Sequence, residues 1–89
     1  MPGEYSLYQN YPNPFNPVTH FEFWIANFGF ASIKIYDVLG NEVKTLVKHD
    51  LHPGIYEIEW DASNYPSGIY FYTLSAGEFS ETRKAVLIK

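Results

Sequence analysis

Few side chains in this sequence have the types and spacing that catalysis or metal binding requires. His49, Asp50 and His52 lie close together in a predicted turn and could hold a metal ion, but the usual ligand spacing is not evident, which favours a solvated loop. Glu57 and Glu59 share one face of a predicted strand and would suit a carboxylate pair, although such residues on an exposed sheet more often add only solubility. There is no cysteine, no glycine-rich phosphate loop and no nucleophile elbow. We therefore expect no enzyme, no metal and no cofactor.

Exposed aromatic side chains are the stronger binding signal. The alternation of apolar and polar residues predicts that Trp24 points away from the core, with Phe28, Phe30 and Tyr36 near it at the strand ends. Such a platform could stack on sugar rings or receive a partner protein. The alternative is that the N-terminal segment or a neighbouring domain covers Trp24.

Length and composition narrow the class of protein. The 89 residues make one small domain, and the 19% of aromatic residues favours strands around an aromatic core. The net charge of -4 argues against a basic face that would bind nucleic acid or an anionic membrane. No apolar run approaches the roughly 20 residues that a membrane span needs, and the absence of cysteine rules out disulfides.

Alternating residues predict a series of short strands and essentially no helix. Residues 18–25 and 31–36 form strands that either pair or face each other across the core, and residues 4–10 could form a short edge strand. Residues 42–47 form a further strand with Val43 and Leu46 inward, and residues 49–54 break the pattern. Residues 55–60 form the next strand, and residues 67–89 form a final hairpin that turns at 76–78.

About seven strands of this kind predict an all-β fold, a two-sheet antiparallel sandwich of immunoglobulin or fibronectin type III style. Tyr70, at the start of a late strand, resembles the tyrosine corner of such folds, in which the phenol bonds to backbone upstream. Trp60 would anchor the core between the sheets.

The proline-rich stretch 11–17 excludes a helix or a central strand, because Pro12, Pro14 and Pro17 each fix φ and lack an N–H group. We expect an irregular crossover loop whose Tyr11 and Phe15 plug one end of the core. The alternative, a proline-rich ligand for an aromatic groove, lacks a repeated PxxP register.

Several blocks in this order resemble one family, the C-terminal sorting domains of the bacterial type IX (Por) secretion system, which are related to the immunoglobulin-like domain of flagellar hook-capping proteins. The blocks are Leu7 to Pro17 followed by Thr19, Phe21 and Phe23; Ile35-Tyr36-Asp37 with Gly40 and Val43; Pro53-Gly54 leading to Trp60-Asp61; Ser67 to Tyr72 with Leu74, Ala76 and Gly77; and the basic, apolar end Thr82 to Lys89. The sequence departs from the family at Ala26, in the aromatic segment 28–30 and in the short loop 61–67.

The resemblance implies a domain that acts as a sorting signal for the protein of which it is a part. A larger cargo protein would precede residues 4–89, which form a single sorting domain, and residues 1–3 look like an expression start. In this family the domain crosses the periplasm, is recognised by the outer-membrane translocon, and is commonly removed by a sortase-like peptidase that attaches the cargo to the cell surface. Its mechanism would be recognition without catalysis.

Residue by residue, Gly68 and Tyr70 match the glycine-x-tyrosine block of the family, and Lys84 and Lys89 match its terminal lysines. Together with Arg83 they are the expected recognition residues. A terminal edge strand with cations would offer main-chain hydrogen bonds for strand addition and charge for an acidic receptor. The lysines would equally protect the edge against aggregation.

Two other functions stay open at this stage. The aromatic platform would suit a carbohydrate-binding or adhesive immunoglobulin-like module, and the fold alone would suit a flagellar hook-cap subdomain. The exposed edges of a small sandwich would also allow a weak homodimer.

Overall fold

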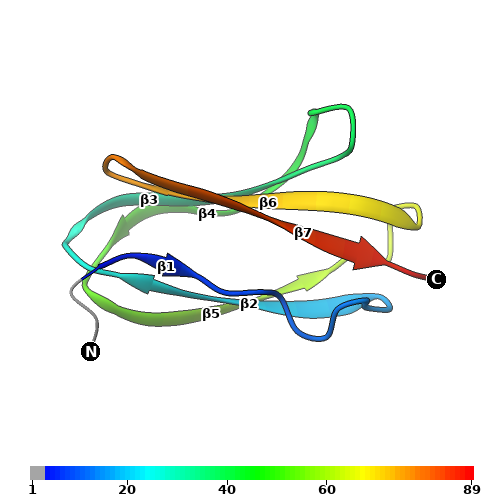
Figure 1. Cartoon of the computed structure of the whole chain (residues 1–89), viewed down its shortest axis with the longest axis horizontal. Coiled ribbons are helices and arrows are strands. Elements are labelled where there is room, and N and C mark those ends of the chain that lie inside the picture. Colours follow the sequence, from blue (N-terminus) through cyan, green and yellow to red (C-terminus); the bar gives the residue numbers. More distant parts are fainter. Residues whose placement is uncertain (1–3) are drawn as a thin grey trace.

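Two antiparallel sheets pack face to face in the computed structural model, which describes residues 4–89 (Figure 1). The three-stranded sheet has the order β1-β2-β5, with bounds Ser6–Leu7, Val18–Ile25 and Gly54–Asp61. The four-stranded sheet has the order β4-β3-β6-β7, with bounds Glu42–Leu51, Gly29–Tyr36, Gly68–Ala76 and Phe79–Leu87. Residues 4–89 include no helix, and hence none that could span a membrane. The predicted sandwich is confirmed; the interpretation of residues 1–3 lies outside the described range.

The core lies between strands β2 and β3, which belong to different sheets and so face each other rather than pair. Their inward faces carry the buried residues Thr19, Phe21, Phe23, Ile25, Ala31, Ile33 and Ile35, and Ser32 of β3 is buried as well. Every second residue of a strand points to the same side, so the alternation in the sequence becomes one apolar face on each strand. Burial of these faces is the main contribution that holds the two sheets together.

Trp60 and Tyr70 occupy the positions that the sequence predicted. Trp60 is buried, with its ring centroid 5.6 Å from that of Phe15 and 5.4 Å from that of Tyr65. The phenol of Tyr70 donates a hydrogen bond of 2.6 Å to the carbonyl oxygen of Pro66, and burial raises its pKa. The core anchor and the tyrosine corner are therefore confirmed.

Strand β4 is longer than predicted, because it runs through the expected break at residues 49–51. Its pairing with β3 is irregular between Ile33 and Lys34, and such irregularities shift which side chains face inward. Val43 and Leu46 pack against the core only in part, whereas Val47 and Leu51 are buried. Simple alternation could not place these residues because the sequence does not mark the irregularity.

The proline-rich segment crosses between the sheets, as predicted, but only one of its two aromatic residues enters the core. Phe15 is 2% exposed, whereas Tyr11 is 79% exposed. Tyr11 exchanges backbone hydrogen bonds of 3.0 and 2.9 Å with His20 at the edge of β2, which leaves its ring in solvent. The prediction that Tyr11 plugs the core is wrong.

Candidate recognition surface

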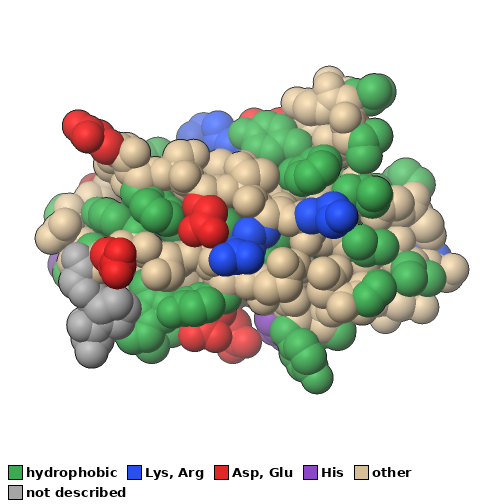
Figure 2. All heavy atoms as spheres, in the orientation of Figure 1, with side chains coloured by type: hydrophobic (Ala, Val, Ile, Leu, Met, Phe, Trp, Pro, Cys, Tyr) green, Lys and Arg blue, Asp and Glu red, His purple; other side chains and the backbone are tan. Residues whose placement is uncertain are grey.

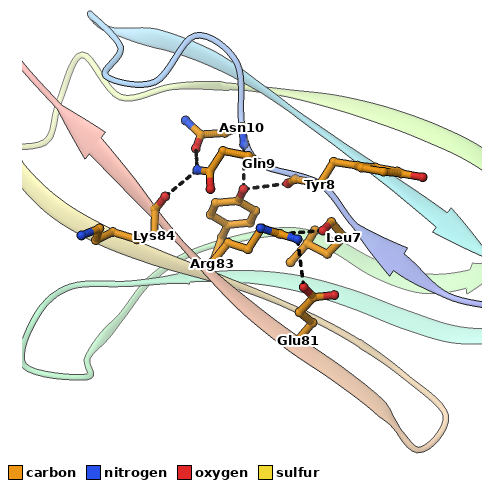
Figure 3. Close-up of polar contacts among 8 residues, drawn as sticks. Leu7, Tyr8, Gln9, Asn10, Glu81, Arg83 and Lys84 are labelled. Atoms are coloured by element: carbon orange, nitrogen blue, oxygen red, sulfur yellow. Dashed lines mark hydrogen bonds and ion pairs between the residues drawn. The ribbon is translucent and has the colours of Figure 1, made fainter.

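The outer edge of β7 is closed over its second half by the N-terminal segment 7–15, which we call the strap. The amide of Phe15 donates to the Val86 carbonyl and the amide of Ile88 donates to the Phe15 carbonyl, both at 2.9 Å. The side chain of Asn13 accepts from the Val86 amide at 2.9 Å, and Gln9 donates to the Lys84 carbonyl at 2.7 Å (Figure 3). The prediction of a free edge for strand addition is therefore wrong for residues 84–88.

A buried phenol fixes the strap to the sandwich. Tyr72 points inward from β6, where its hydroxyl accepts a hydrogen bond from the Asn10 amide and donates one to the Tyr8 carbonyl, both at 2.7 Å. Burial raises the pKa of Tyr72 to about 12, because the phenolate would lose its hydration. The neutral hydroxyl thus serves two backbone groups of the strap, and the bond to the Asn10 amide is a buried one.

Asn10 organises the bend of the strap from the inside. Its side-chain amide donates to the Thr19 hydroxyl at 2.9 Å and to the Pro12 carbonyl at 3.1 Å, while Gln9 donates to its side-chain oxygen at 2.7 Å. Asn10 and Thr19 are both buried polar residues, so these contacts satisfy groups that water cannot reach. The bend is accordingly held by a connected polar network.

The expected recognition residues divide into structural and exposed ones. Tyr70 is buried, and Gly68 begins β6 with a φ of 153°. The Arg83 guanidinium donates to the Leu7 carbonyl at 2.6 Å and lies 3.2 Å from the Glu81 carboxylate (Figure 3). Lys84 is exposed and has no carboxylate within ion-pair distance among residues 4–89.

Lys89, the last residue, is exposed beside the loop between β5 and β6. Its ammonium donates to the Ser63 carbonyl at 2.5 Å, and its amide donates to the Ser67 hydroxyl at 3.0 Å. The side chain of Lys89 therefore has a partner within the domain, and Lys84 carries the less engaged charge.

The four residues of the predicted aromatic platform do not share one surface. Trp24 is on the outer face of the three-stranded sheet, whereas Phe30 and Tyr36 are on the outer face of the four-stranded sheet. Phe28 lies in the loop between β2 and β3, where its ring centroid is 4.8 Å from that of His52. The sandwich separates these residues because the chain changes sheet between Trp24 and Phe30.

Polar side chains form no recognisable catalytic or metal site in the described part of the chain. Glu57 and Glu59 share the outer face of β5, where Glu57 is paired across the strands with Glu22 and Glu59 lies 3.6 Å from His20. Residues 4–89 contain no pocket and no group of three side chains that could hold a metal ion. His49, Asp50 and His52 are all exposed.

Comparison with known proteins identifies the family. Residues 9–89 match the family described as "Secretion system C-terminal sorting domain". The chain belongs to this family. The sorting domain is also similar to part of a solved structure, dimeric latent PorU from Porphyromonas gingivalis, with a TM-score of 0.73 and 17% sequence identity over 94% of this chain and 9% of PorU. None of the curated proteins matches the chain.

The function of the sorting domain is that of a C-terminal signal for type IX secretion, which directs a protein to the cell surface or the extracellular space. The likeness to PorU concerns the fold and covers only a small part of that protein. The predicted family and the predicted function are both confirmed.

Sequence reasoning missed the contacts that join the strap of the sorting domain to β6 and β7. One signal for them was present: Tyr70 and Tyr72 are two residues apart, so both rings of this strand face the core. The hydroxyl of a buried tyrosine usually has a hydrogen-bond partner, and such a partner was predicted from the sequence for Tyr70 but not for Tyr72. The amides of Asn10 and Asn13 carried no such signal, because asparagine is common in irregular segments.

Proposed function

We propose that this sorting domain acts by recognition without catalysis. A cargo protein precedes residue 4, accompanies the domain through the periplasm, and crosses the outer membrane when the type IX translocon binds the domain. A sortase-like peptidase then separates the cargo from the domain. The observation that carries the proposal is the family match over residues 9–89.

In this proposal the five candidate residues of β6, β7 and the C-terminus have different tasks. Gly68 and Tyr70 shape the start of β6, Arg83 ties β7 to the strap, and Lys84 and Lys89 supply positive charge for an acidic receptor. Strand addition along residues 84–88 would have to displace the strap. Recognition at this part of β7 therefore proceeds through side chains.

Charge substitutions test this proposal better than a truncation, because deletion of residues 83–89 would also remove the buried Ala85 and Leu87. The full chain is fused behind a reporter protein in a bacterium that has a type IX system. Export of the wild-type fusion tests the function itself. The double change Lys84→Gln and Lys89→Gln is expected to reduce the reporter at the cell surface by about tenfold, the effect of losing roughly 1.4 kcal/mol of binding free energy.

The matched control is the double change Lys44→Gln and Lys48→Gln, which removes two exposed lysines from β4 of the same sheet. It alters the net charge equally and should leave export unchanged. Equal losses in both variants would show that total charge matters rather than the end of β7. Unchanged export with Lys84 and Lys89 replaced would remove these residues from the recognition surface.

A further inference from the structure

A turn between β3 and β4 holds two apolar side chains out in solvent. Val38 is 64% exposed and Leu39 is 83% exposed, the largest exposed fraction of any large hydrophobic residue among those described in residues 4–89. Single exposed hydrophobic residues are common on protein surfaces. Two adjacent exposed hydrophobic residues that adjoin further apolar surface instead indicate a binding site.

The turn is rigid. One carboxylate oxygen of Asp37 accepts hydrogen bonds from the amides of Leu39 and Asn41, each at 2.9 Å, and the Gly40 amide donates to the Asp37 carbonyl at 3.0 Å. Gly40 has a φ of 87°, a conformation that side chains disfavour. Val38 and Leu39 are thus presented in one conformation, which lowers the entropic cost of binding them.

More apolar side chains lie on the adjoining outer face of β6 and β7. Ile69 is 41% exposed and is paired across the strands with Val86, and Phe71 faces the same side of β6. Ile88 is 51% exposed and follows β7. In Figure 2, hydrophobic side chains extend from the raised β3–β4 turn to the C-terminal end of the molecule. We call this surface the apolar patch; its residues are Val38, Leu39, Ile69, Phe71, Val86 and Ile88.

Positive charge borders the apolar patch. Lys84 is paired across the strands with Phe71, whereas the ammonium of Lys89 is held at the Ser63 carbonyl in the loop between β5 and β6. The carboxylate of Asp37 is engaged by the turn, and that of Glu42 lies 3.8 Å from the Lys34 ammonium. The opposite outer face, on the three-stranded sheet, instead carries the acidic side chains Glu22, Glu57, Glu59 and Asp61. A partner with carboxylates would therefore be attracted to the apolar patch and repelled by the other face.

The apolar patch also lies away from the point where a cargo would join. The described chain enters at one end of the long axis of the sandwich, and the C-terminus and the β3–β4 turn lie toward the other end (Figure 1). The long dimension of the Cα trace is 37 Å. The apolar patch is thus separated along the domain from the end at which a preceding protein would be attached.

We propose that the apolar patch docks into an apolar recess, rimmed by carboxylates, on a protein of the type IX machinery. This inference rests on the proposed function and extends it from the lysines of the C-terminal strand to the turn after β3. Leu39 and Ile69 enter the recess, and Lys84 meets a carboxylate at its rim. Asp37 is a positioning residue that keeps the turn in its binding conformation.

The test uses the reporter fusion of the full chain, with Leu39→Ser and Ile69→Thr as single changes. The matched control is Ile55→Thr, because Ile55 is 53% exposed on the acidic outer face of β5. Circular dichroism and thermal unfolding of the purified domains check that each variant folds. Each patch variant is expected to place about tenfold less reporter at the cell surface than wild type, with Ile55→Thr unchanged.

The results separate the docking surface from the sorting function. If the wild-type fusion is not exported, the proposed function fails and the docking site falls with it. If wild type and the folded Leu39→Ser and Ile69→Thr variants are exported equally, the docking site alone is overturned. Sedimentation of the purified domain provides a second arm: self-association that is lost in both patch variants would assign the patch to a second copy of the chain and overturn the proposal.

Discussion

At the scale of single residues, two tyrosines on β6 each form hydrogen bonds to backbone groups, but in different surroundings. The Tyr72 hydroxyl accepts a buried hydrogen bond from the Asn10 amide, whereas the Tyr70 hydroxyl donates a part-buried one to the carbonyl of Pro66, an exposed residue. Water can replace the second bond but not the first. The difference can be measured with conservative substitutions that remove only the hydroxyl.

We predict that Tyr72→Phe destabilises the domain more than Tyr70→Phe. The first change leaves a buried amide without a partner, which costs about 1–3 kcal/mol, while the second loses one net hydrogen bond of about 1 kcal/mol. Urea unfolding of the two variants and of the wild-type domain gives the free energies. Equal losses, or a larger loss for Tyr70→Phe, would contradict the view that Tyr72 is the stronger attachment of the strap.

At the scale of elements, the strap divides the edge of β7 into a closed and an open half. The amides of Val86 and Ile88 donate to the strap. The amide of Thr82 points to the same edge, since residues an even number apart on a strand point the same way, and the contacts among residues 4–89 give it no partner there. Edge groups that are left open invite pairing with another strand, which the strap prevents near the C-terminus.

We predict that hydrogen exchange will show this division. The amides of Val86 and Ile88 should exchange at least about tenfold more slowly than that of Thr82, because they are released only when the strap opens. The substitution Asn13→Ala removes the acceptor of the Val86 amide and should accelerate that amide more than Ile88, which is held by the Phe15 carbonyl. Fast exchange of all three amides in the wild-type domain would mean that the strap does not close the edge.

At the scale of the whole molecule, the two outer faces differ in charge and in apolar surface. One carries carboxylates from β2 and β5, and the other carries lysines and the apolar patch. Two copies of the chain would meet carboxylate against carboxylate if the acidic faces were opposed. This asymmetry favours a domain that binds a different protein by one face.

Whole-molecule stability should fall at alkaline pH through Tyr72. Its pKa is raised from 10.0 to about 12 in the folded domain, so the stabilisation is complete below pH 10, where the phenol is neutral in both states. It is lost as the pH rises from about 10 to 12, by up to about 2 to 3 kcal/mol. Urea unfolding at a series of pH values measures this, with Tyr72→Phe as reference. If the variant loses stability as steeply as wild type, another group is responsible.

The strands, the core faces, the tyrosine corner and the family were all predictable from the amino-acid sequence. Each depends on residues that are close together in the sequence. Alternation of apolar and polar residues indicates the two faces of a single strand, and each family block consists of neighbouring residues. Alternation did not predict the inward face of β4, where the pairing with β3 is irregular, or the exposed ring of Tyr11, whose backbone is bonded to His20.

The surfaces that these residues form depend on contacts between distant parts of the chain. The contact between Asn10 and Tyr72 joins residues 62 positions apart, and that between Asn13 and Val86 joins residues 73 apart. No local pattern encodes such pairs, because the partner of a polar group is set by the path of the chain between the sheets. The same path separates Trp24 from Phe30 and brings β3 beside β6, so that the β3–β4 turn adjoins the outer face on which the sorting domain presents its apolar patch.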